Sequence, residues 1–230
     1  MVSEKLLKSI FTIYEIVLYN VTMQSKRVDD IFEYLAELIP NPRCELDYVT
    51  DIDLLVAIIL SAQCTDRRVN AVTKVLFEKY RTINDYADAC HLEFEKDIYS
   101  TGFYRNKAKN IIALCKKLRD DFGSVIPGDV DVLEKLPGIG RKTASVFVAE
   151  FHKKPAIAVD THVIRVSRRL GFTTSRNPDV IQRDLMKLFD EGNWCLYHKY
   201  LVLFGRYYCT ARGPKCDECG VSEYCVEFRG

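Results

Sequence analysis

Lys142 and Asp160 are the two residues of this chain whose types and spacing best suit covalent chemistry. Lys142 begins an apolar helical stretch, and Asp160 follows the apolar run Ala156–Val159 at the start of the next predicted helix. The positive end of a helix, with Arg141 alongside, favours the neutral amine that can attack carbon. Taken singly, Asp160 would be a helix N-cap and Lys142 a solvated lysine. Together they are what an amine nucleophile and its acid–base partner require.

The segment that positions Lys142 is LPGIGRK, residues 136–142. Two glycines around one aliphatic residue predict a tight hairpin whose backbone can approach a ligand closely, because no Cβ intervenes. A Gly-X-Gly turn that opens a helix also presents N–H groups suited to a phosphate oxygen. Gly138, Ile139, Gly140 and Arg141 are therefore candidate phosphate contacts. An ordinary corner between two helices is the alternative, and the spacing excludes the common nucleotide-binding loops.

Four of the nine cysteines lie within seventeen residues at the C-terminal end, spaced C-x6-C-x2-C-x5-C. They are Cys209, Cys216, Cys219 and Cys225. Zinc is usually held by two paired Cys-x-x-Cys arms, and only one such pair occurs here. The spacing therefore favours an iron–sulfur cubane, with zinc and a disulfide knot as alternatives. The other five cysteines are scattered singly through apolar stretches and are predicted to be buried thiols.

The composition neither requires nor excludes nucleic acid as a ligand. At 230 residues and 48% hydrophobic, the chain can form one large or two small cores. Its formal charge of +1 is low for a nucleic-acid binder, which tends to have a pI above about 9. Local clusters near predicted helix starts can still supply a positive field. These are Arg105/Lys107/Lys109, Arg141/Lys142 and Arg165/Arg168/Arg169.

Apolar periodicity is helical almost throughout, so the predicted fold is all-α. The stretch 54–60 is apolar on all sides and indicates a fully buried helix, although its length would also allow a strand. A helix is expected to begin after Thr65, and another to end at Gly123. A further one should follow Asn177.

The N-terminal stretch Leu6–Val21 is apolar but broken by polar residues, too short to span a bilayer, and without a signal-peptide cleavage site. It is expected to be an extra helix or extension. Clustered thiols without an export signal indicate a reducing compartment, so a cytoplasmic protein with no membrane partner is predicted.

Hairpin, lysine, acid and cysteine loop, in this order, resemble the endonuclease III family of helix-hairpin-helix DNA glycosylases, which carry a [4Fe–4S] cluster. The likeness extends from about Arg27 to Cys225. Cys64 and Phe103 occupy positions where family members often have alanine and leucine. The motifs that carry this resemblance are LSAQ (60–63), GFYRNKA (102–108), LPGIGRKTA (136–144), VDTH (159–162) and GRY (205–207), which leads into the cysteines.

The resemblance implies two helical domains and a monomeric protein. Residues 44–154 would form a helical barrel with the hairpin, and 23–43 plus 155–230 an iron–sulfur cluster domain. Residues 1–22 would be an N-terminal extension without a counterpart in short family members. Lys142 and Asp160 would face each other across the cleft between the domains.

The implied activity is that of a base-excision DNA glycosylase and AP lyase, which removes oxidised pyrimidines from duplex DNA and nicks the strand by β-elimination. Lys142 would attack the sugar C1′, and Asp160 would deprotonate the lysine and stabilise positive charge on the sugar. Gln63 would fill the space of the extruded base, and Phe103 would wedge into the opposite strand. The four cysteines would hold the [4Fe–4S] cluster, which would fix a loop that docks on DNA at damaged pyrimidines or abasic sites.

Two other functions are compatible with parts of this pattern. A related adenine or mismatch glycosylase would lack lyase activity, but such enzymes usually lack a lysine at position 142. A non-catalytic iron–sulfur or zinc protein could bind DNA through the hairpin alone. By their residue types alone, Gln63 would be a loop-capping amide and Phe103 a core aromatic.

Overall fold

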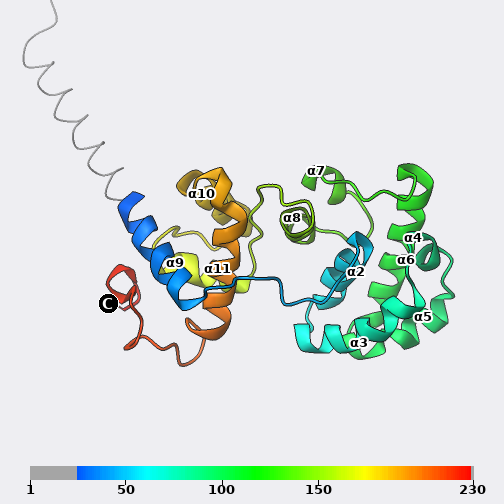
Figure 1. The fold of residues 1–230 in the computed structure, drawn as a ribbon, viewed down its shortest axis with the longest axis horizontal. Coiled ribbons are helices and arrows are strands. Elements are labelled where there is room, and N and C mark those ends of the chain that lie inside the picture. The colour runs from blue at the N-terminus through cyan, green and yellow to red at the C-terminus, as the bar shows by residue number, and fades with distance from the viewer. Residues whose placement is uncertain (1–24, 229–230) are drawn as a thin grey trace, which may run out of the picture. The chain divides into compact units, whose positions relative to one another are not determined.

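The structure, a computed structural model, describes residues 25–228, and every regular element in this range is a helix (Figure 1). No strand occurs among these residues, which confirms the predicted all-α fold. Nor does any helix between residues 25 and 228 combine the length and apolar character needed to cross a membrane. The predicted extension at 1–22 and the helix expected at Leu6–Val21 lie outside the described residues.

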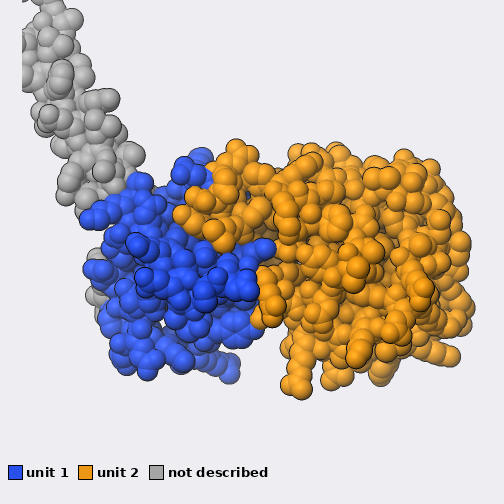
Figure 2. All heavy atoms as spheres, viewed as in Figure 1, with its two compact units in different colours: residues 1–42, 161–190, 199–230 blue, residues 43–160, 191–198 orange. Residues whose placement is uncertain are grey.

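The described chain divides into two compact units, coloured separately in Figure 2. Unit 1 contains the described parts of 1–42 and 199–230 together with Thr161–Asp190, and unit 2 contains Arg43–Asp160 and Glu191–His198. The cluster domain expected from the sequence also includes 155–160 and 191–198, which are grouped with unit 2 here. The division into functional domains stays a prediction.

The core of unit 2 is built around helix α2 (Asp51–Ser61). Every residue from Ile52 to Leu60 is buried, as predicted for a helix that is apolar on all sides. The helix begins with a capping box, in which the Thr50 side chain accepts from the Asp53 N–H and the Asp53 carboxylate accepts from the Thr50 N–H at 3.0 Å. This pairing explains how a carboxylate can be buried in an apolar helix.

Four more helices of unit 2 agree with the sequence pattern. The predicted start after Thr65 and stop at Gly123 are both confirmed, and Gly123 has the left-handed φ of +59° that a glycine C-cap supplies. The four helices are α3 (Asp66–Lys79), α6 (Tyr104–Phe122), α7 (Val130–Leu133) and α8 (Arg141–Glu150).

Two short helices, α4 (Ile83–Ala87) and α5 (His91–Asp97), lack apolar periodicity in the sequence, although a Thr82/Asp85 capping box marks the start of α4. Five and seven residues are too few for apolar periodicity to emerge. Packed aromatic rings hold this region together: Tyr80 lies 5.2 Å from Tyr86 and 5.3 Å from Phe94 between ring centroids. The 3-10 helix η1 (Tyr99–Thr101) then leads into α6.

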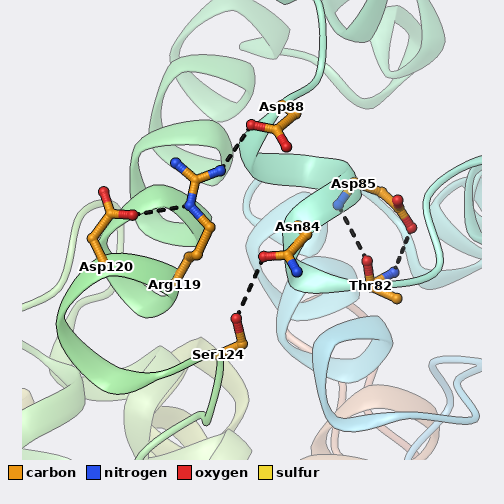
Figure 3. A network of polar contacts seen from close by, with 7 residues as sticks. All are labelled: Thr82, Asn84, Asp85, Asp88, Arg119, Asp120 and Ser124. Atoms are coloured by element: carbon orange, nitrogen blue, oxygen red, sulfur yellow. Dashed lines mark hydrogen bonds and ion pairs between the residues drawn. The ribbon is translucent and has the colours of Figure 1, made fainter.

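Polar contacts also link α4 to the end of α6 (Figure 3). Arg119 donates to Asp88 at 2.8 Å and to Asp120 at 2.9 Å, and the Ser124 hydroxyl lies 3.4 Å from the Asn84 side-chain oxygen. These groups are exposed, and exposed ion pairs typically contribute no more than about 1 kcal/mol. Aromatic packing therefore stabilises this corner more than its charges do.

Unit 1 contains a smaller aromatic core. The Phe32 and Phe172 rings each meet the Phe189 ring edge-on, with centroids 5.2 Å and 5.4 Å away. The predicted helix after Asn177 is confirmed. The helices are residues 25–38, α9 (Thr161–Arg169), α10 (Pro178–Leu188), most of α11 (Trp194–Tyr207), and the 3-10 helix η3 (Ser222–Tyr224), while the 3-10 helix η2 (Glu191–Asn193) is grouped with unit 2.

Gly205 explains why the GRY motif of α11 begins with glycine. A Cβ atom there would lie 2.9 Å from His162 Cβ and 3.0 Å from Val166 Cγ2 on α9. The two helices can therefore approach only over a residue without a side chain.

The prediction that the five scattered cysteines are all buried is wrong. Cys115 on α6 is buried, but Cys90 is exposed. Cys90 occupies the N-cap position of α5, at the surface, between Asp88 and His91.

Candidate active site and metal centre

A tight hairpin joins α7 to α8, as the LPGIGRK segment predicts. The Ile139 N–H donates to the Leu136 carbonyl at 3.2 Å, and the Ile139 side chain is buried. Gly138 and Gly140 are exposed on either side of it. Gly140 is the N-cap of α8 and offers no side-chain cap, so the first turn of α8 presents its amides without a capping group from that residue.

The two glycines of the hairpin differ in what makes them necessary. Gly138 has φ of +74°, and a Cβ there would lie 2.6 Å from Asn110 Cβ. Gly140 has φ of −99°, and nothing lies within 4 Å of its Cβ position. The fold itself therefore requires Gly138, whereas the space beside Gly140 is open to an approaching ligand.

Arg141 braces the hairpin from the side of α7. Its guanidinium lies 2.8 Å from Asp131 and 3.2 Å from Glu134. The hydrogen bond that Arg141 donates to Asp131, helped by Glu134, raises the pKa of Arg141. These carboxylates offset much of the charge that the sequence assigned to DNA binding, a role that stays a prediction.

Lys142 and Asp160 come together within unit 2. The Lys142 Nζ lies 4.0 Å from Asp160 Oδ2, although the two residues are eighteen apart in sequence. The lysine side chain is 58% exposed and the aspartate side chain only 14%. Asp160 follows the buried run Ala156–Val159, which anchors it, whereas the amine on the first turn of α8 is accessible.

Gln63 and Phe103 lie in two loops of unit 2, after α2 and before α6. Both residues have a left-handed backbone conformation, with φ of +55° for Gln63 and +46° for Phe103. Residues other than glycine rarely adopt this conformation. Gln63 is exposed, and Phe103 is 64% exposed. The alternative of a core aromatic is therefore wrong for Phe103.

The cysteine loop of unit 1 encloses a cavity of about 330 Å³. All four predicted ligands line it: Cys209, Cys216, Cys219 and Cys225. Burial raises the pKa of the Cys219 thiol, and the three neighbouring cysteines add to this. Thiolates in such a space require a bound cation, and the cavity has room for a polynuclear cluster. Between residues 25 and 228, no group of three or more His, Cys, Asp or Glu side chains has the close spacing that binding a metal ion would need.

Two arginines on α9 support this loop from inside the protein. Arg165 donates to the Cys209 carbonyl at 3.0 Å, and Arg169 donates to the Cys209 sulfur at 3.4 Å and to the Thr210 carbonyl at 2.9 Å. Burial is the largest influence on the Cys209 thiol and raises its pKa, while Arg169 opposes that shift.

Two of the positive clusters do not lie wholly at the protein surface. Arg165 and Arg169 face the cysteine loop, and Lys107 is only 6% exposed. Four-residue spacing on α9 was a usable signal for the arginines, because it places both on one helix face. For Lys107, the chain offers no comparable signal.

Comparison with known proteins assigns the hairpin region and the cysteine loop to known protein families. Residues 56–191 match the HhH-GPD superfamily of base excision DNA repair proteins, and residues 209–225 match the iron–sulfur binding domain of endonuclease III. The endonuclease III of Bacillus subtilis is 44% identical over 88% of this chain and 93% of its own length. That of Rickettsia felis is 45% identical over 90% of this chain and 97% of its own.

The chain belongs to the endonuclease III family. A solved structure of a trapped endonuclease III–DNA covalent intermediate superimposes with a TM-score of 0.85 at 45% identity, covering 89% of this chain and 97% of that one. The protein is therefore a DNA glycosylase with AP lyase activity in base excision repair, and its cofactor is a [4Fe–4S] cluster.

The cavity lined by the four cysteines suits that cofactor. Four thiolate donors in one loop are the usual ligand set of a cubane. The sequence left zinc and a disulfide knot open, and the family assignment removes both. Cluster binding also explains why so polar a loop can be ordered.

Proposed function

We propose that this protein removes oxidised pyrimidines from duplex DNA and cleaves the resulting abasic strand by β-elimination. Lys142 acts as the nucleophile and Asp160 as its acid–base partner. The observation that carries the proposal is the 4.0 Å separation of Lys142 Nζ and Asp160 Oδ2, with the amine accessible and the carboxylate shielded. A covalent complex with DNA in a relative that is 45% identical supports it.

Binding must first extrude the damaged nucleotide, because a stacked base hides its glycosidic carbon. Amides of Gly138 and Gly140 hold a backbone phosphate beside the lesion, and Arg141 adds charge. Ile139 shapes the turn instead of contacting the phosphate, because its N–H already donates to the Leu136 carbonyl. The exposed Gln63 side chain occupies the space left by the extruded base, and the exposed Phe103 side chain wedges into the opposite strand. Extrusion then presents C1′ to Lys142.

The covalent step transfers the lone pair of the Lys142 amine to C1′, while the C1′–base bond breaks and its electron pair leaves with the base. Asp160 takes the proton from the lysine and stabilises positive charge on the sugar. Opening of the sugar ring yields a Schiff base. Loss of a proton at C2′ then forms a carbon–carbon double bond and expels the 3′ phosphate, which nicks the strand.

The cluster takes no part in these steps and fixes the loop at residues 209–225. We propose that the enzyme acts as a monomer on the chromosome in the bacterial cytoplasm. Size-exclusion chromatography of the purified protein, with and without a short duplex, tests the monomeric state.

A panel of labelled duplexes tests the proposed function. We expect base release and nicking with thymine glycol, nicking with an abasic site, and no release of adenine from a mismatch. Base release without nicking would indicate a glycosylase that lacks lyase activity. Binding without base release or nicking would indicate a non-catalytic protein.

A further inference from the structure

Lys107 is a buried lysine on the first turn of α6. Its exposure is 6%, whereas Arg105 and Lys109, two residues to either side, are exposed. The Nζ atom donates to the Leu60 carbonyl at 2.7 Å and to the Thr101 carbonyl at 2.8 Å. One amine therefore joins two backbone segments that are 41 residues apart (60 to 101).

Both acceptors lie beside the loops that carry the exposed Gln63 and Phe103. Leu60 is in the last turn of α2, where carbonyls have no partner within the helix, and Gln63 follows three residues later. Thr101 ends η1, and Phe103 follows two residues later. Lys107 is thus the direct connection between the bases of both loops.

The conformation of these loops needs such support. Gln63 and Phe103 each have a positive φ, and side chains in this region persist only when the surrounding structure holds them there. Phe103 is also the N-cap of α6 and makes no side-chain cap hydrogen bond. The Lys107 amine fixes the backbone just before each strained residue.

We propose that Lys107 is a positioning residue that holds the Gln63 and Phe103 loops in register, so that both side chains enter the duplex together. This rests on the proposed function of the two loops. Burial lowers the pKa of Lys107. Even the neutral amine keeps two N–H donors, so both hydrogen bonds persist in either protonation state.

The test compares Lys107→Met with Lys116→Met, which removes an exposed lysine from the same helix. Each is assayed in single turnover on thymine glycol in a paired duplex and on the same lesion in an unpaired bubble. We expect Lys107→Met to slow excision in the paired duplex by about tenfold or more, because extrusion there depends on both loops. In the bubble it should act near the wild-type rate, and Lys116→Met should match wild type on both.

A second readout does not depend on catalysis. Binding to a duplex with 2-aminopurine opposite an uncleavable abasic analogue should raise fluorescence with wild type, and much less with Lys107→Met at saturation. Retained cluster absorbance and circular dichroism confirm folding. If the methionine variant does not fold, Lys107→Gln, which keeps an amide donor, is measured in the same way.

If Lys107→Met slows excision equally on the paired and bubble substrates, the proposal is overturned, because Lys107 would then support the fold or the chemistry in general. Unchanged excision of the paired lesion would overturn it as well. An inactive wild type would instead contradict the proposed function, and the fluorescence comparison would still decide the role of Lys107.

Discussion

The α7–α8 hairpin and the cysteine loop are both expected to contact DNA, but they are ordered in different ways. The hairpin is held by its own packing, with Ile139 buried and Asn110 beside Gly138. The cysteine loop surrounds a cavity, and its sulfur and carbonyl groups are met by arginines from α9. The reactive region is therefore preformed by the protein, whereas the cysteine loop depends on an inorganic ligand.

Removing a cluster ligand should give the largest effect. Cys219→Ser leaves three thiolates around the cavity, so iron content should drop from about four per chain and soluble yield should decline sharply. Iron analysis and visible absorbance measure this directly. Serine at Cys115, which is buried on α6 in unit 2, is the control and should retain iron. Full iron occupancy in the Cys219 variant would contradict the view that the cysteine loop, unlike the hairpin, depends on a cluster bound by all four cysteines.

Asp160→Asn should act on chemistry rather than on binding. Losing one positioned acid–base group is expected to slow base excision by about 10²-fold or more, measured in single turnover. Duplex affinity should be preserved or raised, because a negative charge is removed from the site. Asp131→Asn, at an exposed carboxylate beside Arg141, is the control and should excise normally. If the Asp160 variant excises normally but melts much earlier, Asp160 serves only as a helix cap.

The hairpin glycines should separate fold from binding. Gly138→Ala places a Cβ at a φ of +74° and 2.6 Å from Asn110, so stability should drop by about 1–3 kcal/mol in a denaturant titration. Gly140→Ala meets neither obstacle and should fold normally, yet weaken binding to damaged and undamaged duplexes alike, since phosphate contacts carry no lesion information. A loss confined to damaged DNA would show that the hairpin does not grip the backbone.

The helices with strong local signals were predictable from sequence. A Thr65 cap, a Gly123 stop and an Asn177 start each act within one turn of the chain, so local chemistry decides them. The cysteine spacing likewise identifies a metal loop, because all four ligands lie close together in sequence. The short helices α4 and α5 escape prediction because five and seven residues are too few to show apolar periodicity.

Side-chain direction was the part that sequence could not supply. Lys107 and Lys109 look alike in the pattern, yet one is buried against two carbonyls and the other is exposed. In the sequence Arg169 resembles a phosphate-binding residue, but in the structure its guanidinium donates to the Cys209 sulfur. The approach of Lys142 to Asp160 also depends on tertiary packing, which no spacing rule describes.

The most direct test of the account is borohydride trapping of Lys142 on an abasic or thymine-glycol duplex. Reduction of a Schiff base is irreversible, so wild type should form a covalent protein–DNA adduct. Lys142→Gln should form neither adduct nor nick while keeping cluster absorbance and much of its DNA affinity. Lys142→Arg should fail equally, because a guanidinium stays protonated and cannot attack carbon. An arginine variant that traps and nicks like wild type would contradict the assignment of Lys142 as the nucleophile.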